Sequence, residues 1–216
     1  MATVQTSEVP SFSALSDSLG SAYFYDCYTV ALPQDGRSPL ELYLSVVSRT
    51  PRWIDFLMNV RNKIVAQLGL KDMGTLSAID QSKPAHAYRI GDQIGIFKLL
   101  ELHEHEVILG ETDTHLDVKI SVAKQNQLGS TSVFVSTVVH VHNTMERLYM
   151  FFVTPAHRII APATISNVTA QARQALKTQA HSIVPTRTSL TVRPSRHPQV
   201  SLVGSLRAAH SGAAYL

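Results

Sequence analysis

Residues 95–125 read GIFKLLELHEHEVILGETDTHLDVKISVAKQ, and residues 130–162 read STSVFVSTVVHVHNTMERLYMFFVTPAHRIIAP. Several strand-like runs follow one another here and lead into a segment that opens with Thr154-Pro155, a pattern typical of a helix start. Strands in succession followed by a helix predict an antiparallel sheet that packs against a terminal helix. An architecture of this kind usually encloses a pocket for a small molecule, and no catalytic motif is present in these residues.

The composition is that of a globular protein. The chain has 216 residues, enough for one domain with a substantial core, and its contents of 44% hydrophobic and 16% charged residues fit this class. The only cysteine, Cys27, excludes an intramolecular disulfide, and no run is long enough for a membrane span. The first residues lack a basic start followed by an apolar core, so we expect a cytoplasmic protein.

The formal net charge of +3 comes from one end of the chain. Residues 177–216 hold five of the 19 basic residues and none of the 16 acidic ones, so the remainder carries 14 basic and 16 acidic side chains. Because the remainder is slightly acidic, we expect no nucleic-acid partner. Residues 177–216 also lack helical or strand periodicity, which predicts a basic, disordered tail.

Two helices are predicted after a first strand over residues 22–32. The first begins at Ser38-Pro39, which forms a capping box with Glu41, and runs toward Arg49. The second follows Thr50-Pro51 and carries an apolar stripe at spacings of three and four, which predicts that this side, Trp53 included, is buried. The stripe consists of Trp53, Phe56, Leu57, Val60, Ile64 and Leu68.

Further strands are predicted over residues 95–102, 106–110, 115–124, 132–142 and 147–153. The run 115–124 alternates between apolar and polar residues, which predicts one buried and one wet face. The run 132–142 is apolar on both faces and predicts a central strand. A helix kinked by Pro162 is expected to start at Thr154-Pro155, with Ile159 and Ile160 on its inner side.

Segments spread over about residues 20–176 resemble a bacterial domain-of-unknown-function family, number 2867. They include Pro51-Arg52-Trp53, Gly110-Glu111, His115-Leu116-Asp117, His142-Asn143, Arg147-Leu148-Tyr149 and Pro155-Ala156-His157-Arg158. The element order is similar to that of the helix-grip fold of START-like and Bet v 1-like proteins.

This resemblance implies an α+β domain over residues 21–176. The expected fold is a curved antiparallel sheet of about six strands, with two short helices after the first strand and a long C-terminal helix across the sheet. Residues 1–20 would be a flexible N-terminal segment, and residues 177–216 the tail. The family has no assigned reaction, so the resemblance implies a fold and no chemistry.

Polar residues gather at one end of the predicted hairpin over residues 115–142. They are Glu111, Asp113, His115, Asp117, His140 and His142. Three imidazoles and a carboxylate are ligand types of a zinc or iron site, but solvated histidines at a strand end are the simpler interpretation, so we predict no metal and no cofactor. A pair of His115 with Asp117 or Glu111 can act as acid and base, or can support the hairpin. No motif decides whether the chain is an enzyme.

His157 and Arg158 open the final helix beside the expected pocket. Arg158 can bind a carboxylate or phosphate group, or pair with an acid on the sheet, or do both. We therefore predict that the chain binds a small hydrophobic or amphipathic molecule between sheet and C-terminal helix. The candidate ligand-binding residues are His115, Asp117, His142, Asn143, Tyr149, His157 and Arg158. The alternatives are a cyclase- or hydrolase-type enzyme using the same cavity, and a protein-interaction module; the oligomeric state is undecided.

Overall fold

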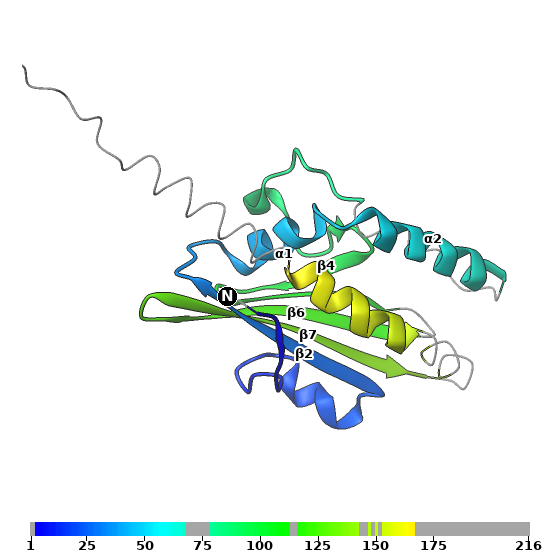
Figure 1. Ribbon diagram of the computed structural model, residues 1–216, viewed down its shortest axis with the longest axis horizontal. Helices are drawn as coiled ribbons and strands as arrows, with labels where there is room; N and C mark the ends of the chain where they lie inside the picture. Colours follow the sequence, from blue (N-terminus) through cyan, green and yellow to red (C-terminus); the bar gives the residue numbers. More distant parts are fainter. Residues whose placement is uncertain are drawn as a thin grey trace, which may run out of the picture.

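The computed structural model describes residues 3–67, 78–112, 116–142 and 153–166, together with Arg147 and Met150. Of residues 61, 64–67 and 116 it describes the backbone alone. This part of the chain forms one open antiparallel sheet with helices on one face and an N-terminal segment on the other (Figure 1). The α+β class is therefore confirmed. The domain boundaries at residues 20 and 176 stay a prediction.

The sheet has seven strands in the order β1-β2-β7-β6-β5-β4-β3, and all neighbours are antiparallel. The strands are β1 (Gln5–Thr6), β2 (Phe24–Pro33), β3 (Gln93–Ile94), β4 (Phe97–Leu102), β5 (Glu106–Thr112), β6 (Leu116–Gln127) and β7 (Ser130–Val141). The sequence predicts about six strands. Two strands of only two residues, β1 and β3, lie at the edges and were not predicted.

The helices are the 3-10 helix η1 (Ser16–Ser21), α1 (Pro39–Val47), α2 (Arg52–Gln67), the 3-10 helix η2 (Ala85–Ala87) and a helix over residues 153–166, called here the C-terminal helix. The predicted strand over residues 147–153 is wrong, because Arg147, Met150 and Val153 are helical. Short apolar runs do not distinguish strand from helix. Pro155 is accordingly not the first helical residue, and Ile159, expected on the inner side, is exposed.

The hairpin of β6 and β7 is the longest pairing in the sheet. It pairs every residue from Leu116 with Val141 to Gln127 with Ser130, which leaves Leu128 and Gly129 as the turn. Gly129 has a φ of 77°, a conformation that glycine adopts without a steric penalty. The predicted hairpin, centred near Leu128, is confirmed, and β7 lies between β2 and β6 as its apolar run predicted.

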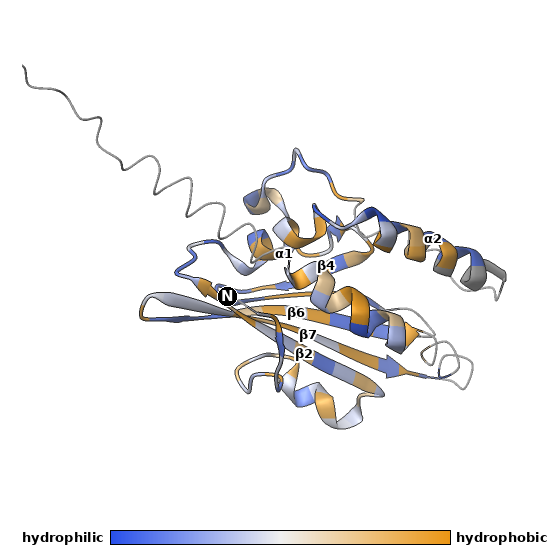
Figure 2. Ribbon diagram, viewed as in Figure 1, coloured by the Kyte–Doolittle hydropathy of each residue, from blue (hydrophilic) through white to orange (hydrophobic). Residues whose placement is uncertain are grey.

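One face of the sheet, the front face, packs against α1 and the C-terminal helix (Figures 1 and 2). Alternate residues of each strand point to this face, because strand side chains have a period of two. The shared core includes Val30, Leu32, Leu99, Leu109, Val122 and Val133 of the sheet, Leu40, Tyr43 and Val47 of α1, and Ile165 of the C-terminal helix. Burial of this apolar surface is the main source of stability for the domain.

The opposite face, the back face, is covered by residues 7–22. Leu15 packs against Ile108 and Val138, and the Phe12 ring meets the Phe134 ring edge-on at a centroid distance of 6.0 Å. Side chains of this segment thus form a second, smaller apolar cluster, and the flexibility expected for residues 1–20 stays a prediction.

A buried carboxylate fixes this N-terminal segment to the sheet. Glu106 accepts hydrogen bonds from Ser13 Oγ (2.5 Å) and Ser121 Oγ (2.5 Å) on one oxygen, and from the Ala14 backbone N–H (2.9 Å) on the other. Hydrogen bonds to a charged group stabilise more than neutral ones do, and a buried carboxylate requires such partners. Glu106 therefore ties residues 13 and 14 to β5 and β6.

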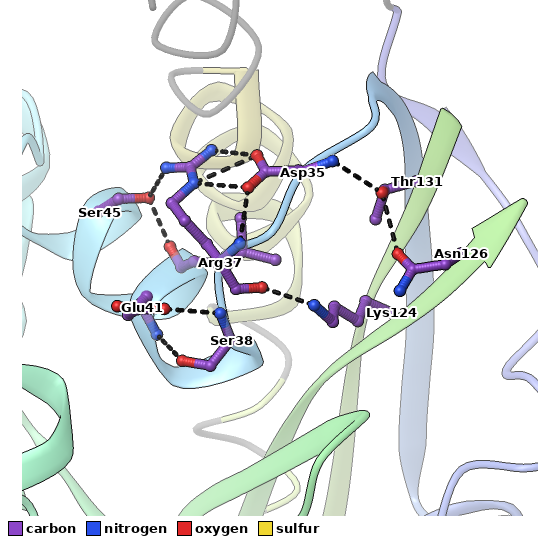
Figure 3. Close-up of polar contacts among 9 residues, drawn as sticks. Asp35, Arg37, Ser38, Glu41, Ser45, Lys124, Asn126 and Thr131 are labelled. Atoms are coloured by element: carbon purple, nitrogen blue, oxygen red, sulfur yellow. Dashed lines mark hydrogen bonds and ion pairs between the residues drawn. The ribbon is translucent and has the colours of Figure 1, made fainter. Parts of the chain in front are cut away.

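The start of α1 shows why the sequence forms a helix there. Ser38 Oγ accepts from the Glu41 N–H (3.2 Å), and the Glu41 carboxylate accepts from the Ser38 N–H (2.7 Å), which completes the predicted capping box (Figure 3). Before it, the Arg37 guanidinium donates to both oxygens of Asp35, with a shortest distance of 2.6 Å. Lys124 Nζ on β6 donates to the Arg37 carbonyl (2.7 Å). These contacts anchor the α1 start to the sheet.

The orientation of α2 differs from the prediction. Ile54 is fully buried and Met58 packs against the core, so this side of α2 faces the domain. The described side chains of the predicted stripe lie on another side of the helix and are exposed: Trp53, Phe56, Leu57 and Val60. The side chain of Ile64 and all of Leu68 lie outside the described part of the chain. The prediction that Trp53 is a core residue is therefore wrong. Periodicity identifies an apolar side, but tertiary packing decides which side is buried.

Replacing Asp35 by Asn should change how stability depends on pH. Burial raises the pKa of Asp35, but the hydrogen bonds and charge of Arg37 outweigh it and hold the pKa below its ordinary value of 3.8. A lowered folded-state pKa contributes stability above the unfolded-state pKa, and this contribution is lost as the pH falls through the folded-state value. As the pH falls below about 4, the free energy of unfolding measured in urea should therefore decrease more steeply for the wild type than for Asp35→Asn. The same pH dependence of this free energy in both proteins would contradict the prediction.

Gly110→Ala should destabilise the sheet by about 2 kcal/mol, since overpacking of a closed site costs this much. A Cβ at Gly110 would lie 2.6 Å from the Val118 carbonyl oxygen and 2.8 Å from Leu100 Cδ1, and the backbone oxygen cannot move aside. The matched control is Gly36→Ala, because a Cβ at Gly36 has nothing within 4 Å. Chemical denaturation of both variants measures the difference; equal stabilities would be the contrary result.

Candidate functional site

An open pocket of about 470 Å³ lies where the β1–β2 edge of the sheet meets the C-terminal helix. The sheet contributes aromatic, apolar and acidic side chains, and the helix contributes a guanidinium. The lining residues are Val4, Thr6, Phe24, Tyr25, Asp26, Tyr28, Arg158 and Pro162. The volume is within the range of small-molecule sites, roughly 300–1,000 Å³.

The register of β2 explains why an acid lies on this apolar face. Phe24, Asp26 and Tyr28 are two residues apart, so they share the front face with Val30. Asp26 is paired with Thr137 on β7, directly below the C-terminal helix. A carboxylate therefore occupies a position where the strand otherwise presents aromatic and aliphatic side chains.

His157 connects the helix to that carboxylate. Its Nε2 lies 3.4 Å from Asp26 Oδ1 in hydrogen-bond geometry, 3.2 Å from Oδ2, and 3.4 Å from Thr137 Oγ1. The Phe24 ring meets the imidazole edge-on at 5.8 Å and 86°. Asp26 Oδ2 is buried and makes no hydrogen bond within the described part of the chain. The pair spans sheet and helix at one wall of the pocket.

Tyr28 and Arg158 supply the other polar groups. Burial raises the pKa of Tyr28, the nearby Asp26 carboxylate raises it further, and the positive charge of Arg158 offsets part of this effect. The Tyr28 hydroxyl is therefore held neutral between an anion and a cation, where it can donate or accept a hydrogen bond. Arg158 is itself exposed at the pocket.

This arrangement has the chemistry of a binding site for an amphipathic molecule. Aromatic rings of Phe24 and Tyr28 offer apolar surface, and the Arg158 guanidinium offers a bidentate donor for a carboxylate or phosphate group. An imidazole and a carboxylate can donate and accept a proton, and the contact of His157 with Asp26 also holds the helix on the sheet.

A family model described as Protein of unknown function (DUF2867) matches residues 18–164. The chain belongs to this family. The match covers more than half of the chain and includes Asp26, His157 and Arg158, but not Val4 and Thr6 of the pocket. A comparison with curated proteins finds no significant match.

In this DUF2867 protein, the predicted site residues divide between the two faces of the sheet. His157 and Arg158 lie on the front face beside the pocket. Asp117 is paired with His140 across β6 and β7 and lies on the back face, where its carboxylate is 3.4 Å from His142 Nε2. The structure therefore does not bring Asp117 and His142 together with Arg158.

The other predicted polar residues have separate partners or are not described. His140 Nε2 lies 3.2 Å from both Ser21 Oγ and the Ser18 carbonyl of η1, and the Glu111 carboxylate is 3.5 Å from Lys98 Nζ. The described residues contain no group of three or more histidine, cysteine or acidic side chains placed to hold a metal ion. The residues that lie outside the described part are Asp113, His115, Asn143 and Tyr149.

Sequence reasoning did not identify Phe24, Asp26 and Tyr28 as site residues of this DUF2867 chain. A signal was present, because Asp26 interrupts an aromatic face of a strand whose later residues on that face, Val30 and Leu32, are core residues. An acid on a buried strand face requires a partner. Only the tertiary structure shows that this partner is His157.

A double-mutant cycle with Asp26→Asn and His157→Gln should give a coupling free energy of about 1 kcal/mol, because both side chains are largely buried, with exposed fractions of 24% for His157 and 17% for Asp26. The pair of His142 and Asp117 is a matched control with exposed fractions of 47% and 27%. Its coupling should be only a few tenths of a kcal/mol, since solvent screens exposed pairs. Urea unfolding measures both cycles. Equal couplings would refute the special role of the first pair.

Proposed function

We propose that this chain binds a small molecule with an aromatic or other apolar body and an anionic group, in the pocket between β2 and the C-terminal helix. The observation that carries the proposal is the Arg158 guanidinium at the edge of a pocket whose walls are mainly aromatic and apolar. A mostly apolar pocket with few polar groups is the usual form of a small-molecule site.

The charge of Arg158 supports an anionic ligand over a neutral one. A bidentate contact from arginine to a carboxylate is among the stronger polar interactions available to a protein. Asp26 acts in the opposite direction and repels an anion, but its carboxylate already has a partner in His157, whose Nε2 lies 3.2 Å from Asp26 Oδ2. Arg158 is then the charge that selects the ligand, and the rings of Phe24 and Tyr28 contact its apolar body.

The helix-grip assignment and a location in the cytoplasm remain parts of this proposal. The order of elements supports the first, and the single cysteine agrees with the second. The enzyme alternative relied on His115 and Asp117; Asp117 lies on the back face, and His115 is outside the described residues. The interaction-module alternative relied on residues 177–216, which also lie outside them.

Naphthalene-2-carboxylate and its neutral amide form a matched pair of probes for this pocket. The wild type should bind the carboxylate about tenfold more tightly than the amide, because a net charge-assisted hydrogen bond contributes roughly 1.5–3 kcal/mol. Arg158→Gln should remove this difference, and Arg158→Lys should retain part of it. Calorimetry gives the affinities, and protein NMR shifts show whether residues of β2 respond.

Arg89→Gln is the control, since Arg89 is an exposed arginine whose side chain bonds the His86 and Tyr88 carbonyls and lines no part of this pocket. It should leave the affinities for both probes unchanged. The proposal fails if the probes bind equally well to the wild type, or if the shifts lie away from Phe24, Tyr28 and the C-terminal helix.

A further inference from the structure

Helix α2 presents apolar side chains to solvent. Trp53, Phe56, Leu57 and Val60 have exposed fractions of 43%, 65%, 39% and 39%. Their spacing of three, four and seven residues places them along one side of the helix, called here the outer stripe. The opposite side is occupied in the fold, because Ile54 is fully buried. Among the described residues, the outer stripe is therefore an apolar side of α2 that no other element covers.

Such an exposed stripe differs from single apolar residues on a surface. Isolated exposed residues such as Leu128 are common in soluble proteins and need no explanation. A contiguous group that includes Trp53 and Phe56 marks an interaction surface. Figure 2 shows several hydrophobic positions along α2, in addition to those of the sheet and the C-terminal helix.

The charges on α2 indicate an anionic partner. Residues 52–67 contain Arg52, Arg61 and Lys63 against one acid, Asp55, which gives the helix a formal charge of +2. Arg52 and Lys63 are exposed near its two ends. Two copies of this helix face to face would bring like charges together, so the charge disfavours self-association through the outer stripe and favours a negatively charged surface.

The shape of the region favours a lipid surface over an acidic protein. Figure 1 shows α2 extending beyond the sheet as a single projecting helix. A projecting ridge with tryptophan and phenylalanine on its apolar side and flanking basic residues has the properties of helices that lie in the membrane interface. No helix within the described residues is long and apolar enough to cross a membrane, so the contact would be peripheral.

We propose that α2 binds an anionic phospholipid surface, with the outer stripe inserted among the acyl chains and Arg52 and Lys63 at the headgroups. Trp53, Phe56 and Leu57 enter the apolar layer, while the buried side with Ile54 keeps the helix on the domain. This inference does not depend on the small-molecule pocket, which is lined by β1, β2 and the C-terminal helix.

Trp53 is the only tryptophan in the chain, so its fluorescence reports directly on the outer stripe. The full chain is titrated with vesicles of phosphatidylglycerol and phosphatidylcholine, and separately with pure phosphatidylcholine vesicles. We expect a blue shift of the emission and cosedimentation with the anionic vesicles alone, both weakened by salt. Phe56→Ser should lower the partition coefficient at least tenfold, and Arg52→Ser should lower it on anionic vesicles.

Leu128→Ser is the control, because it removes a fully exposed large apolar side chain from the β6–β7 turn, away from α2. It should leave vesicle binding unchanged. The proposal is overturned if anionic vesicles cause no blue shift, or if Phe56→Ser binds as the wild type does. It is also overturned if the Trp53 shift depends on protein concentration without lipid and accompanies a doubled mass in light scattering, which would identify a second copy as the partner.

Discussion

The register of the ladder formed by β2, β7 and β6 is the constraint on which the rest of the structure depends. It is continuous over ten residue pairs between β2 and β7 and over twelve between β6 and β7. Because strand side chains alternate, this register decides the face of every residue on these strands. A slip of one residue in β2 would move Asp26 to the back face and Cys27 to the front, and would remove both core contacts and the pocket wall.

As a result, the front and back faces of the sheet make different contacts. The front face carries the main core, and at the sheet edge it changes into the pocket, where Asp26 meets His157 of the C-terminal helix. The back face holds the N-terminal segment through Glu106 and keeps the pair of Asp117 and His142 away from that pocket. One sheet thus positions two separate groups of ionisable residues, and the front group borders the pocket.

The sequence was sufficient to predict the elements that are determined by local interactions. Capping at Ser38 and alternation around the turn at Leu128 depend on nearby residues, so α1 and the β6–β7 hairpin were predicted with their register. Prediction from the sequence failed for features that depend on packing between distant parts of the chain. The helical state of Met150 and the outward side of α2 at Trp53 follow from tertiary contacts. The pocket likewise depends on a strand and a helix more than a hundred residues apart, of which only the helical residues His157 and Arg158 were predicted.

The place of Cys27 has a consequence for following the motions of this protein. Its side chain lies on the back face, where residues 7–22 pack, and is only 3% exposed. Burial also raises the pKa of its thiol, so the reactive thiolate is scarce while the segment is closed. Since the chain has no other cysteine, the rate at which the Cys27 thiol is alkylated reports how often the N-terminal segment opens locally, and no engineered label is required.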